Sequence, residues 1–201
     1  KTISGTIKDG LIGKNIIDDK LYIFTKNNTT ADLYTVNDNT LDLVLDNLPL
    51  SDNYQLKIAE VTLNNSTTNT LRYVVKNGEN NLTAYQIIDG KALATTLSKT
   101  ANRVLFDDSN QFSKIIYWVD NGLLYSFNME TQEQFSTEYI EGSTYFEYKK
   151  HHLLQLNNNL LSIQDFDFKN RHELTNSNSV IVYKNRIIFN QDKVLLELIL
   201  D

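Results

Sequence analysis

The sequence predicts an all-β fold, a β-propeller-like chain of about five four-stranded blades. Three observations lead to this expectation: short segments in which side chains alternate between apolar and polar, turns rich in Asn, and recurrence of both at intervals of about 40 residues. The chain has 201 residues, of which 41% are hydrophobic. That length suffices for one substantial core, so we expect a single domain over residues 1–201.

The segment Ile115–Glu133, IIYWVDNGLLYSFNMETQE, contains the pattern in its plainest form. Both halves alternate, as half-buried strands do because successive side chains leave opposite faces of a sheet. Asn121-Gly122 between them suits the positive φ angles that a tight hairpin requires. Met129–Gln134 is polar and typical of a surface turn. We therefore predict a strand, a hairpin turn, a second strand and then a surface turn.

The same pattern recurs over residues 20–45, 71–93, 151–174 and 179–200. The second strand of each copy is expected to begin near residue 33, 82, 124, 160 or 187, at spacings of 27 to 49 residues. One four-stranded sheet cannot bury both of its faces alone, so each copy would stack against its neighbours, as propeller blades do. A β-sandwich and a partial propeller are the alternatives.

Two segments leave the secondary structure open. Within residues 89–104, Leu93, Leu97 and Ala101 have helical spacing, which allows a short helix or a long loop. Residues 38–50 fit both periods. We predict a strand for their first half, because Leu-Asp-Leu-Val-Leu-Asp has a period of two, and we expect Pro49 to end the element.

Three short stretches resemble a known repeat: LYTVNDNTLD at 33–42, LTAYQIIDGKAL at 82–93 and LYSFNMETQEQ at 124–134. They are similar to the strand-and-turn phrase of PQQ-like and related bacterial β-propeller repeats. The resemblance implies a propeller fold. The glycine of that phrase is replaced at Gln132 and Leu41, and the tryptophan that docks neighbouring blades is missing, so the resemblance implies no quinone and we predict no cofactor.

Charge and composition exclude several classes of protein. The net charge is −6 and the sequence pI about 5.1, so a cationic face for nucleic acid is not expected. The one basic cluster, Lys149-Lys150-His151-His152, is short and suits a solvated strand entry. The longest apolar run, VLLELIL at 194–200, falls short of the roughly 18 residues of a membrane span. Without cysteine, disulfides and thiolate metal sites are excluded.

Paired carboxylates would indicate a glycoside hydrolase, whose chemistry needs one protonated and one ionised carboxyl group. Asp165 and Asp167 are expected to share one face of a strand. Asp at strand ends is equally typical of turns, where its side chain bonds nearby backbone. We therefore predict no catalytic residues. The candidates considered are Asp107, Asp108, Asp120, Glu147, Asp165 and Asp167.

No metal site is predicted. The segment DDSNQ at 107–111 clusters oxygen ligands but lacks the Asp-x-Asp-x-Asp-Gly order and the distal Glu of a calcium loop. His151 and His152 are neighbours on an expected strand and would point to opposite faces. His172 lies about 20 residues further on, without the spacing of a zinc site.

Aromatic residues crowd the region between residues 117 and 148. Alternation assigns about half of them to the core. Those that point outward would form a recognition platform, since aromatic faces are enriched at binding surfaces. Our candidate binding residues are Trp118, Tyr125, Tyr145 and Glu147.

These features favour a non-catalytic binding or scaffold module that engages another protein or a glycan through its loops. We expect a bacterial exported or envelope protein, such as a lipoprotein, in an extracytoplasmic place. The chain begins with Lys1 rather than Met, which suits either a removed signal segment or a shortened chain. The alternatives are a glycoside hydrolase with carboxylates around a tunnel and a structural segment of a larger surface protein.

Overall fold

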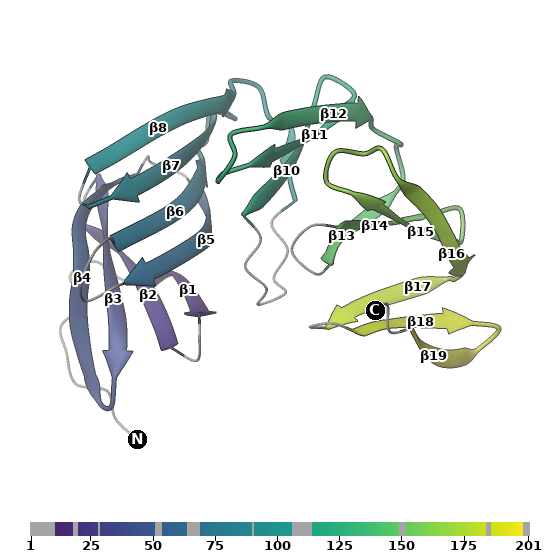
Figure 1. Ribbon diagram of the computed structural model, residues 1–201, viewed down its shortest axis with the longest axis horizontal. Coiled ribbons are helices and arrows are strands. Elements are labelled where there is room, and N and C mark those ends of the chain that lie inside the picture. The colour runs from purple at the N-terminus through teal and green to yellow at the C-terminus, as the bar shows by residue number, and fades with distance from the viewer. Residues whose placement is uncertain are drawn as a thin grey trace. The chain divides into compact units, whose positions relative to one another are not determined.

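The computed structural model describes residues 11–17, 20–27, 29–50, 54–63, 69–89, 91–105, 114–148, 152–183 and 186–198. Within these ranges the chain forms nineteen β-strands in five antiparallel sheets, without a helix (Figure 1). The prediction of an all-β, propeller-like fold with about five blades is confirmed. Four of the sheets have four strands each and the fifth has three.

Every sheet is a meander, in which strands adjacent in sequence are hydrogen-bonded neighbours. This order is that of propeller blades, whereas a sandwich would mix strands from distant copies. Sheet A contains β1 (Leu11–Ile17), β2 (Lys20–Asn27), β3 (Thr30–Asn37) and β4 (Thr40–Pro49). Sheet B contains β5 (Gln55–Leu63), β6 (Asn69–Lys76), β7 (Leu82–Ile88) and β8 (Lys91–Ser98). Sheet C contains β9 (Arg103–Val104), β10 (Ile115–Asp120), β11 (Leu123–Asn128) and β12 (Gln134–Glu138). Sheet D contains β13 (Thr144–Tyr148), β14 (His152–Asn157), β15 (Leu160–Asp165) and β16 (Arg171–Asn176). Sheet E contains β17 (Ser179–Tyr183), β18 (Arg186–Gln191) and β19 (Val194–Leu198).

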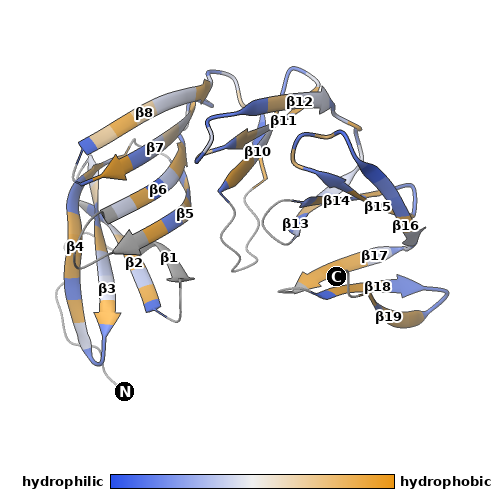
Figure 2. Cartoon of the chain, in the orientation of Figure 1, coloured by the Kyte–Doolittle hydropathy of each residue, from blue (hydrophilic) through white to orange (hydrophobic). Residues whose placement is uncertain are grey.

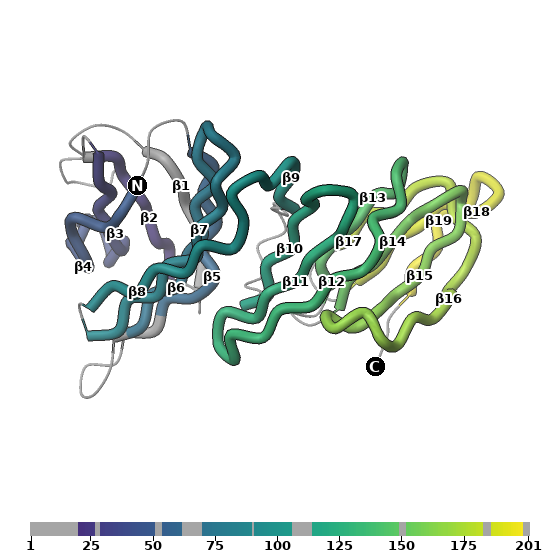
Figure 3. The backbone as a smooth tube through the Cα atoms, turned by 90° about the horizontal axis from the view of Figure 1, so that it is seen from above, coloured from purple at the N-terminus to yellow at the C-terminus, as the bar shows by residue number. Residues whose placement is uncertain are grey.

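The chain divides into two compact units. Unit 1, Lys1–Ala101, contains sheets A and B, and unit 2, Asn102–Asp201, contains sheets C, D and E. In unit 1, β1 contacts β5, and in unit 2, β13 contacts β17, so the first strands of neighbouring sheets meet. Figure 3 shows β13 to β16 running side by side within unit 2. The single domain over residues 1–201 stays a prediction.

A recurring backbone hydrogen bond gives the repeat its structural basis. In sheets B, C and D, a residue after the fourth strand donates its backbone N–H to the carbonyl of the turn between the second and third strands. The donors, at positions 101, 139 and 177, are 38 residues apart, close to the spacing that the sequence predicts. The three bonds are Ala101 to Asn80 at 2.9 Å, Tyr139 to Gly122 at 3.0 Å and Ser177 to Asn159 at 2.6 Å.

The turn between the second and third strands has positive φ at both residues in sheets C, D and E. Such turns match the twist of the strands that they join. The pairs are Asn121-Gly122 (φ 49° and 75°), Asn158-Asn159 (47° and 64°) and Asp192-Lys193 (49° and 68°). The predicted Asn turns of the third and fourth copies are thus confirmed.

In the last copy the sequence predicts the turn at Lys184-Asn185, followed by the strand near Ile187. Lys184-Asn185 lies outside the described residues, and Ile187 belongs to β18, the second strand of sheet E, with β19 as the third. The structural equivalent of Asn121-Gly122 is Asp192-Lys193. Neither Asp nor Lys marks a turn as strongly as Asn-Gly, so the pattern matched the wrong pair.

The helix or loop allowed for residues 89–104 is wrong, because β8 and β9 occupy this stretch. Leu93 and Leu97 are four residues apart, and that spacing returns a side chain to the same face of a strand as well as of a helix. The strand predicted at 38–50 is confirmed, and β4 ends at Pro49.

The core of unit 2 lies in two layers between its sheets. One cluster joins sheets C and D and includes Tyr117, Val119 and Leu124 from C with Tyr145 and Leu153 from D. The other joins sheets D and E: Tyr148, Leu154, Leu161 and Ile163 meet Val180, Ile187 and Phe189. All six residues of β10 are buried, as expected of a central strand covered on both faces.

In unit 1 an aromatic group links sheets A and B. The rings of Phe24 and Tyr73 lie 5.7 Å apart, and Tyr73 stacks on Tyr85 at 5.0 Å. The Tyr73 hydroxyl donates to the carbonyl of Pro49 at 3.0 Å, at the end of β4. The stack therefore packs the two sheets and satisfies the buried hydroxyl together.

Candidate functional site

The four predicted binding residues lie largely within the sheets. Trp118, Glu147 and Tyr145 are only 1%, 4% and 8% exposed. Tyr125 is half-buried and stacks on Trp118, with ring centroids 5.1 Å apart and planes 9° from parallel. Trp118, Tyr145 and Glu147 therefore form no exposed platform, and a part in binding stays a prediction for all four.

Tyr145 belongs to a buried polar network at the face of sheet D that meets sheet C. The Gln155 side-chain amide donates to Ser143 Oγ at 2.9 Å and to Tyr145 Oη at 3.3 Å. The backbone N–H of Ile140 also donates to Tyr145 Oη, at 3.4 Å. Burial is the main cause that raises the pKa of Tyr145. These contacts give Tyr145 a structural role between the sheets.

Tyr117 on sheet C lies close enough to Glu147 on sheet D for the two side chains to interact electrostatically. Burial raises the pKa of the Tyr117 hydroxyl, and the negative charges of Glu147 and then Asp165 raise it further. The phenol is therefore neutral at physiological pH and supplies no phenolate for chemistry.

The acidic candidates occupy different parts of the chain. Asp107 and Asp108 lie outside those residues, as do the segment at 107–111, Lys149, Lys150 and His151. Asp120 is buried, at 9% exposure. Strand β15 ends at Asp165, and Asp167 belongs to the following turn, so the prediction that these two share a strand face is wrong.

The local bonds of Asp165 and Asp167 are those of turn residues. Asp165 accepts from the Asn170 side chain at 2.7 Å and pairs with His152 Nε2 at 3.3 Å. The Lys169 backbone N–H, donating to Asp167, is the main cause that lowers the pKa of Asp167, and the Lys169 side chain adds to it. A general acid needs a raised pKa, so Asp167 cannot serve as one near neutral pH.

No group of three His, Cys, Asp or Glu residues that could hold a metal ion occurs in the part of the chain that the structure describes. His152 pairs with Asp165. His172 lies in β16, opposite Ile163 of β15. The absence of a cofactor stays a prediction.

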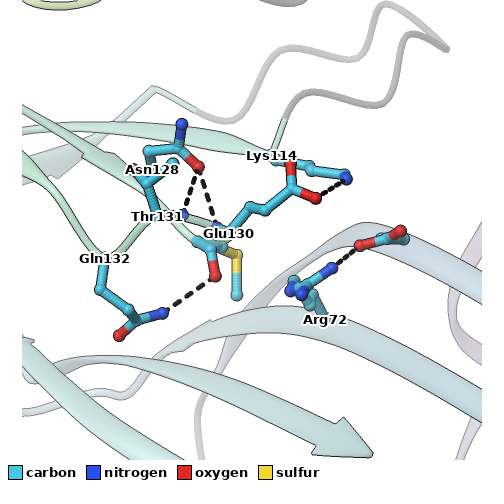
Figure 4. Close-up of polar contacts among 8 residues, drawn as sticks. Arg72, Lys114, Asn128, Glu130, Thr131 and Gln132 are labelled. Carbon is cyan, nitrogen blue, oxygen red and sulfur yellow. Dashed lines mark hydrogen bonds and ion pairs between the residues drawn. The ribbon is translucent and has the colours of Figure 1, made fainter.

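A better candidate surface lies at two exposed turns of unit 2, between the third and fourth strands of sheets C and D. We call it the C–D turn surface and define it as Glu130–Glu133 together with Phe166–Asn170. Figure 4 shows the first turn, in which Asn128 Oδ1 accepts the backbone N–H groups of Glu130 at 2.9 Å and Thr131 at 3.2 Å. Lys114 pairs with Glu130 at 2.9 Å. These bonds hold the turn together with Met129 at its start, whose side chain is buried.

The second turn is held in the same manner. Phe168 has φ 62°, and its N–H donates to the Asp165 carbonyl at 3.0 Å. Asp167 Oδ1 accepts from the Lys169 N–H at 3.2 Å, and Lys169 Nζ pairs with Asp167 at 3.1 Å. Asn170 closes the turn through its bond to Asp165.

Three contacts join the second turn to sheet C. Ser126 Oγ donates to the carbonyl of Phe166. The Phe166 ring meets Phe135 edge-on at 5.5 Å, and Lys169 Nζ lies 5.6 Å from the Phe135 ring centre. The second turn is thus held against the two strands that flank the first turn. On the two turns Glu130, Thr131, Gln132, Glu133, Lys169 and Asn170 are exposed.

The sequence did not predict this surface, although the stretch at 124–134 includes Glu130–Glu133. The stretch at 124–134 served as evidence for the fold only. Gln132 replaces the glycine of the resembling phrase, and it has φ 63°, a conformation that favours glycine. That substitution was the available signal of a tight turn. Leu41, the second replaced glycine, lies in β4, and the positive φ of its copy is at Asp38.

Three solved structures are similar to this chain. The uncharacterized protein lmo1340 from Listeria monocytogenes EGD-e matches with a TM-score of 0.56 and 13% identity, over 98% of this chain and 65% of that one. The WD40 domain of SCAP from fission yeast matches 89% of this chain and 51% of its own length, with a TM-score of 0.49 and 12% identity. The extracellular domain of the putative one component system BT4673 from B. thetaiotaomicron matches 89% of this chain and 26% of that chain, with a TM-score of 0.42 and 12% identity.

The chain spans 65% of the length of the Listeria protein, and the likeness at 13% identity extends to the fold alone. No protein-family model matches the chain, and no curated protein matches it in sequence. Among the described residues, no helix is long and apolar enough to cross a membrane.

Proposed function

We propose that this chain is a propeller-type binding module that docks another macromolecule on the C–D turn surface. The observation that supports this function is the bonding of the second turn to β11 and β12, the strands that flank the first turn, above all Ser126 to Phe166 and the contact of Phe166 with Phe135. A surface that is already ordered loses little conformational freedom on binding, which favours affinity. Rigid sheets that present polar turns are a common basis for recognition.

A protein partner suits the chemistry of this surface best. Glu130 and Glu133 are exposed acids on a chain with a net charge of −6, and Thr131, Gln132 and Asn170 offer amide and hydroxyl groups beside them. Such a surface complements a basic or amide-rich patch and repels phosphate backbones. A glycan is the second class of partner. We further propose a bacterial, extracytoplasmic setting, exported or attached to the envelope.

The resemblance to PQQ-like repeats enters this proposal as a source of framework only. Cofactor binding is not part of the proposed function, because Gln132 and Leu41 stand where the resembling phrase has glycine. The module would serve as a docking part of a larger surface protein or as a scaffold in its own right.

The test compares a double variant, Glu130→Lys with Glu133→Lys, against wild type and against Glu173→Lys, an exposed acid on β16. Each protein is immobilised, and the proteins it retains from an envelope fraction of the source cells are quantified. We expect wild type and Glu173→Lys to retain the same partner and the double variant to lose about tenfold or more. Equal retention by all three would contradict the proposal.

Two further arms separate the rival functions. Binding to a glycan array that disappears in the double variant would make the partner a glycan. Turnover of a furanoside or pyranoside that disappears in Asp165→Asn would replace the binding function by a glycosidase. Circular dichroism of each variant checks that the sheets are retained.

A further inference from the structure

The chain contains two Asn-Gly pairs, and the structure places them in different surroundings. Asn77-Gly78 lies between β6 and β7. Asn121-Gly122 is the turn that joins β10 and β11, two strands rich in hydrophobic residues (Figure 2). An asparagine followed by glycine is prone to lose its side-chain amide, because the backbone nitrogen of a residue without Cβ can approach the asparagine side chain closely. Which pair reacts depends on what holds each asparagine.

Asn77 is held by its own side chain. Its Oδ1 accepts the backbone N–H groups of Glu79 at 3.0 Å and Asn81 at 2.9 Å. Its backbone is held as well, since its N–H donates to the Asn81 carbonyl at 2.9 Å and its carbonyl accepts from Asn80 at 3.1 Å. Both side-chain bonds must break before the amide carbon of Asn77 can turn toward the nitrogen of Gly78.

Asn121 lies in an open turn. Asn121 and Gly122 are both exposed, and within the described residues the Asn121 side chain forms no hydrogen bond. A Cβ atom placed on Gly122 would meet nothing within 4 Å, so the turn has room for its backbone to move. The Asn121 side chain can therefore rotate toward the Gly122 nitrogen without breaking a bond to the rest of the sheet.

We propose that Asn121 is a site of spontaneous modification, at which attack by Gly122 converts it to a mixture of aspartate and isoaspartate. The Gly122 backbone nitrogen loses its proton to water and bonds to Cγ of Asn121, forming a cyclic imide. The bond between Cγ and Nδ2 breaks, and the amide leaves as ammonia with a proton from water. Water then opens the ring. Opening at Cγ gives aspartate, and opening at the main-chain carbonyl gives isoaspartate, in which the backbone runs through the side chain.

The isoaspartate product weakens a bond on which the repeat depends. The Gly122 carbonyl accepts the backbone N–H of Tyr139 at 3.0 Å, the bond that has counterparts in sheets B and D. Isoaspartate lengthens the turn by a carbon atom, which displaces this carbonyl and strains the pairing of Val119 with the buried Leu124. The equivalent turn of sheet D, Asn158-Asn159, contains no glycine and is expected to react slowly.

The wild-type protein supplies its own control for the first test. It is incubated in mildly alkaline buffer and digested at acidic pH, and mass spectrometry measures the conversion at Asn77 and Asn121. We expect Asn121 to convert at least about tenfold faster than Asn77, because the two bonds of the Asn77 side chain must break first. In urea, which removes those bonds, the two rates should become equal. The same ratio of rates in the folded and the unfolded protein overturns the proposal, as does an Asn121 that converts only after unfolding.

The second test uses Asn121→Asp, which carries the new charge on an ordinary backbone. The isoaspartyl form is separated from wild type by ion exchange, and hydrogen exchange of the Tyr139 amide is compared in all of these proteins. We expect exchange about tenfold or more faster in the isoaspartyl form alone, since only that form displaces the Gly122 carbonyl. Equal exchange in every protein, or exchange as fast in Asn121→Asp, overturns the assignment of the damage to the lengthened turn.

Discussion

Sheets D and E share the same turn geometry and strand register, yet their corresponding faces have different surroundings. The face of sheet D that carries Leu154, Leu161 and Ile163 is covered by sheet E. On sheet E the matching face carries Ile181 and Leu195, at 61% and 71% exposure. The comparison shows that the next sheet decides the burial of these leucines, since Leu161 and Leu195 occupy the same register position in their sheets.

The largest expected effect separates these two faces. Leu161→Ala should lower the free energy of unfolding by about 2–5 kcal/mol, because it leaves a cavity between sheets D and E. Leu195→Ala should change it by no more than about 0.5 kcal/mol, since its side chain is mostly in water. Urea denaturation measures the free energy of unfolding of both variants. Equal losses would mean that Leu195 is covered in solution.

A smaller effect is expected on the other face of sheet D, where a polar network adjoins the apolar cluster between sheets C and D. Tyr145→Phe removes the oxygen that accepts from Gln155 and Ile140, and should cost about 1–2 kcal/mol of unfolding free energy. Tyr125→Phe is the control, because Tyr125 is half-buried and should lose no more than about 0.5 kcal/mol. A Tyr145→Phe protein as stable as the control would show that water replaces the network at little cost.

The sequence was informative wherever a local pattern decides the structure. Asn121-Gly122 and Asn158-Asn159 indicated their hairpin turns because Asn and Gly tolerate positive φ. Asp192-Lys193 adopts the same turn without Asn or Gly. The four-stranded repeat followed from these turns. Only the fifth copy, where the signature is missing, was assigned to the wrong strand pair.

The candidate site was harder to predict, for two physical reasons. A period of two tells which residues share a face, but not whether another sheet covers that face, and so Trp118 and Tyr145 were taken as candidates for a surface. The C–D turn surface depends on Ser126 and Phe166, which are 40 residues apart in sequence. No local pattern relates such a pair. It follows only from the way in which the sheets stack.

Substitutions at two turn residues of positive φ should change the stability in opposite directions. Gly122 has φ 75° with open space around it, so Gly122→Ala should cost about 1 kcal/mol through backbone strain alone. Gln132 already bears that strain at φ 63°, and Gln132→Gly should gain up to about 1 kcal/mol, less what its bond to the Met129 carbonyl contributes. Thermal unfolding of the two variants gives the signs. A destabilised Gln132→Gly would show that the side-chain bond outweighs the strain.

The smallest effect concerns the second turn and its dependence on pH. The pKa of Asp167 is lowered, first by the Lys169 N–H and then by the Lys169 side chain. A lowered pKa in the folded state means that the bonds of this turn are fully present above the ordinary Asp range and are lost as pH falls through the lowered value. Lys169→Gln removes the side-chain contribution and keeps the backbone one, so the pKa of Asp167 should rise part of the way to its usual value. Carbon-13 NMR titration of the carboxyl group measures the pKa of Asp167.

Lys193→Gln, in the turn before β19, is the matched control and should leave the pKa of Asp167 unchanged, because Lys193 lies in a different turn of the unit. A titration of Asp167 that is the same in both variants would assign the whole shift to the backbone, and the contact between Lys169 and Asp167 would then lend the C–D turn surface no charge stabilisation.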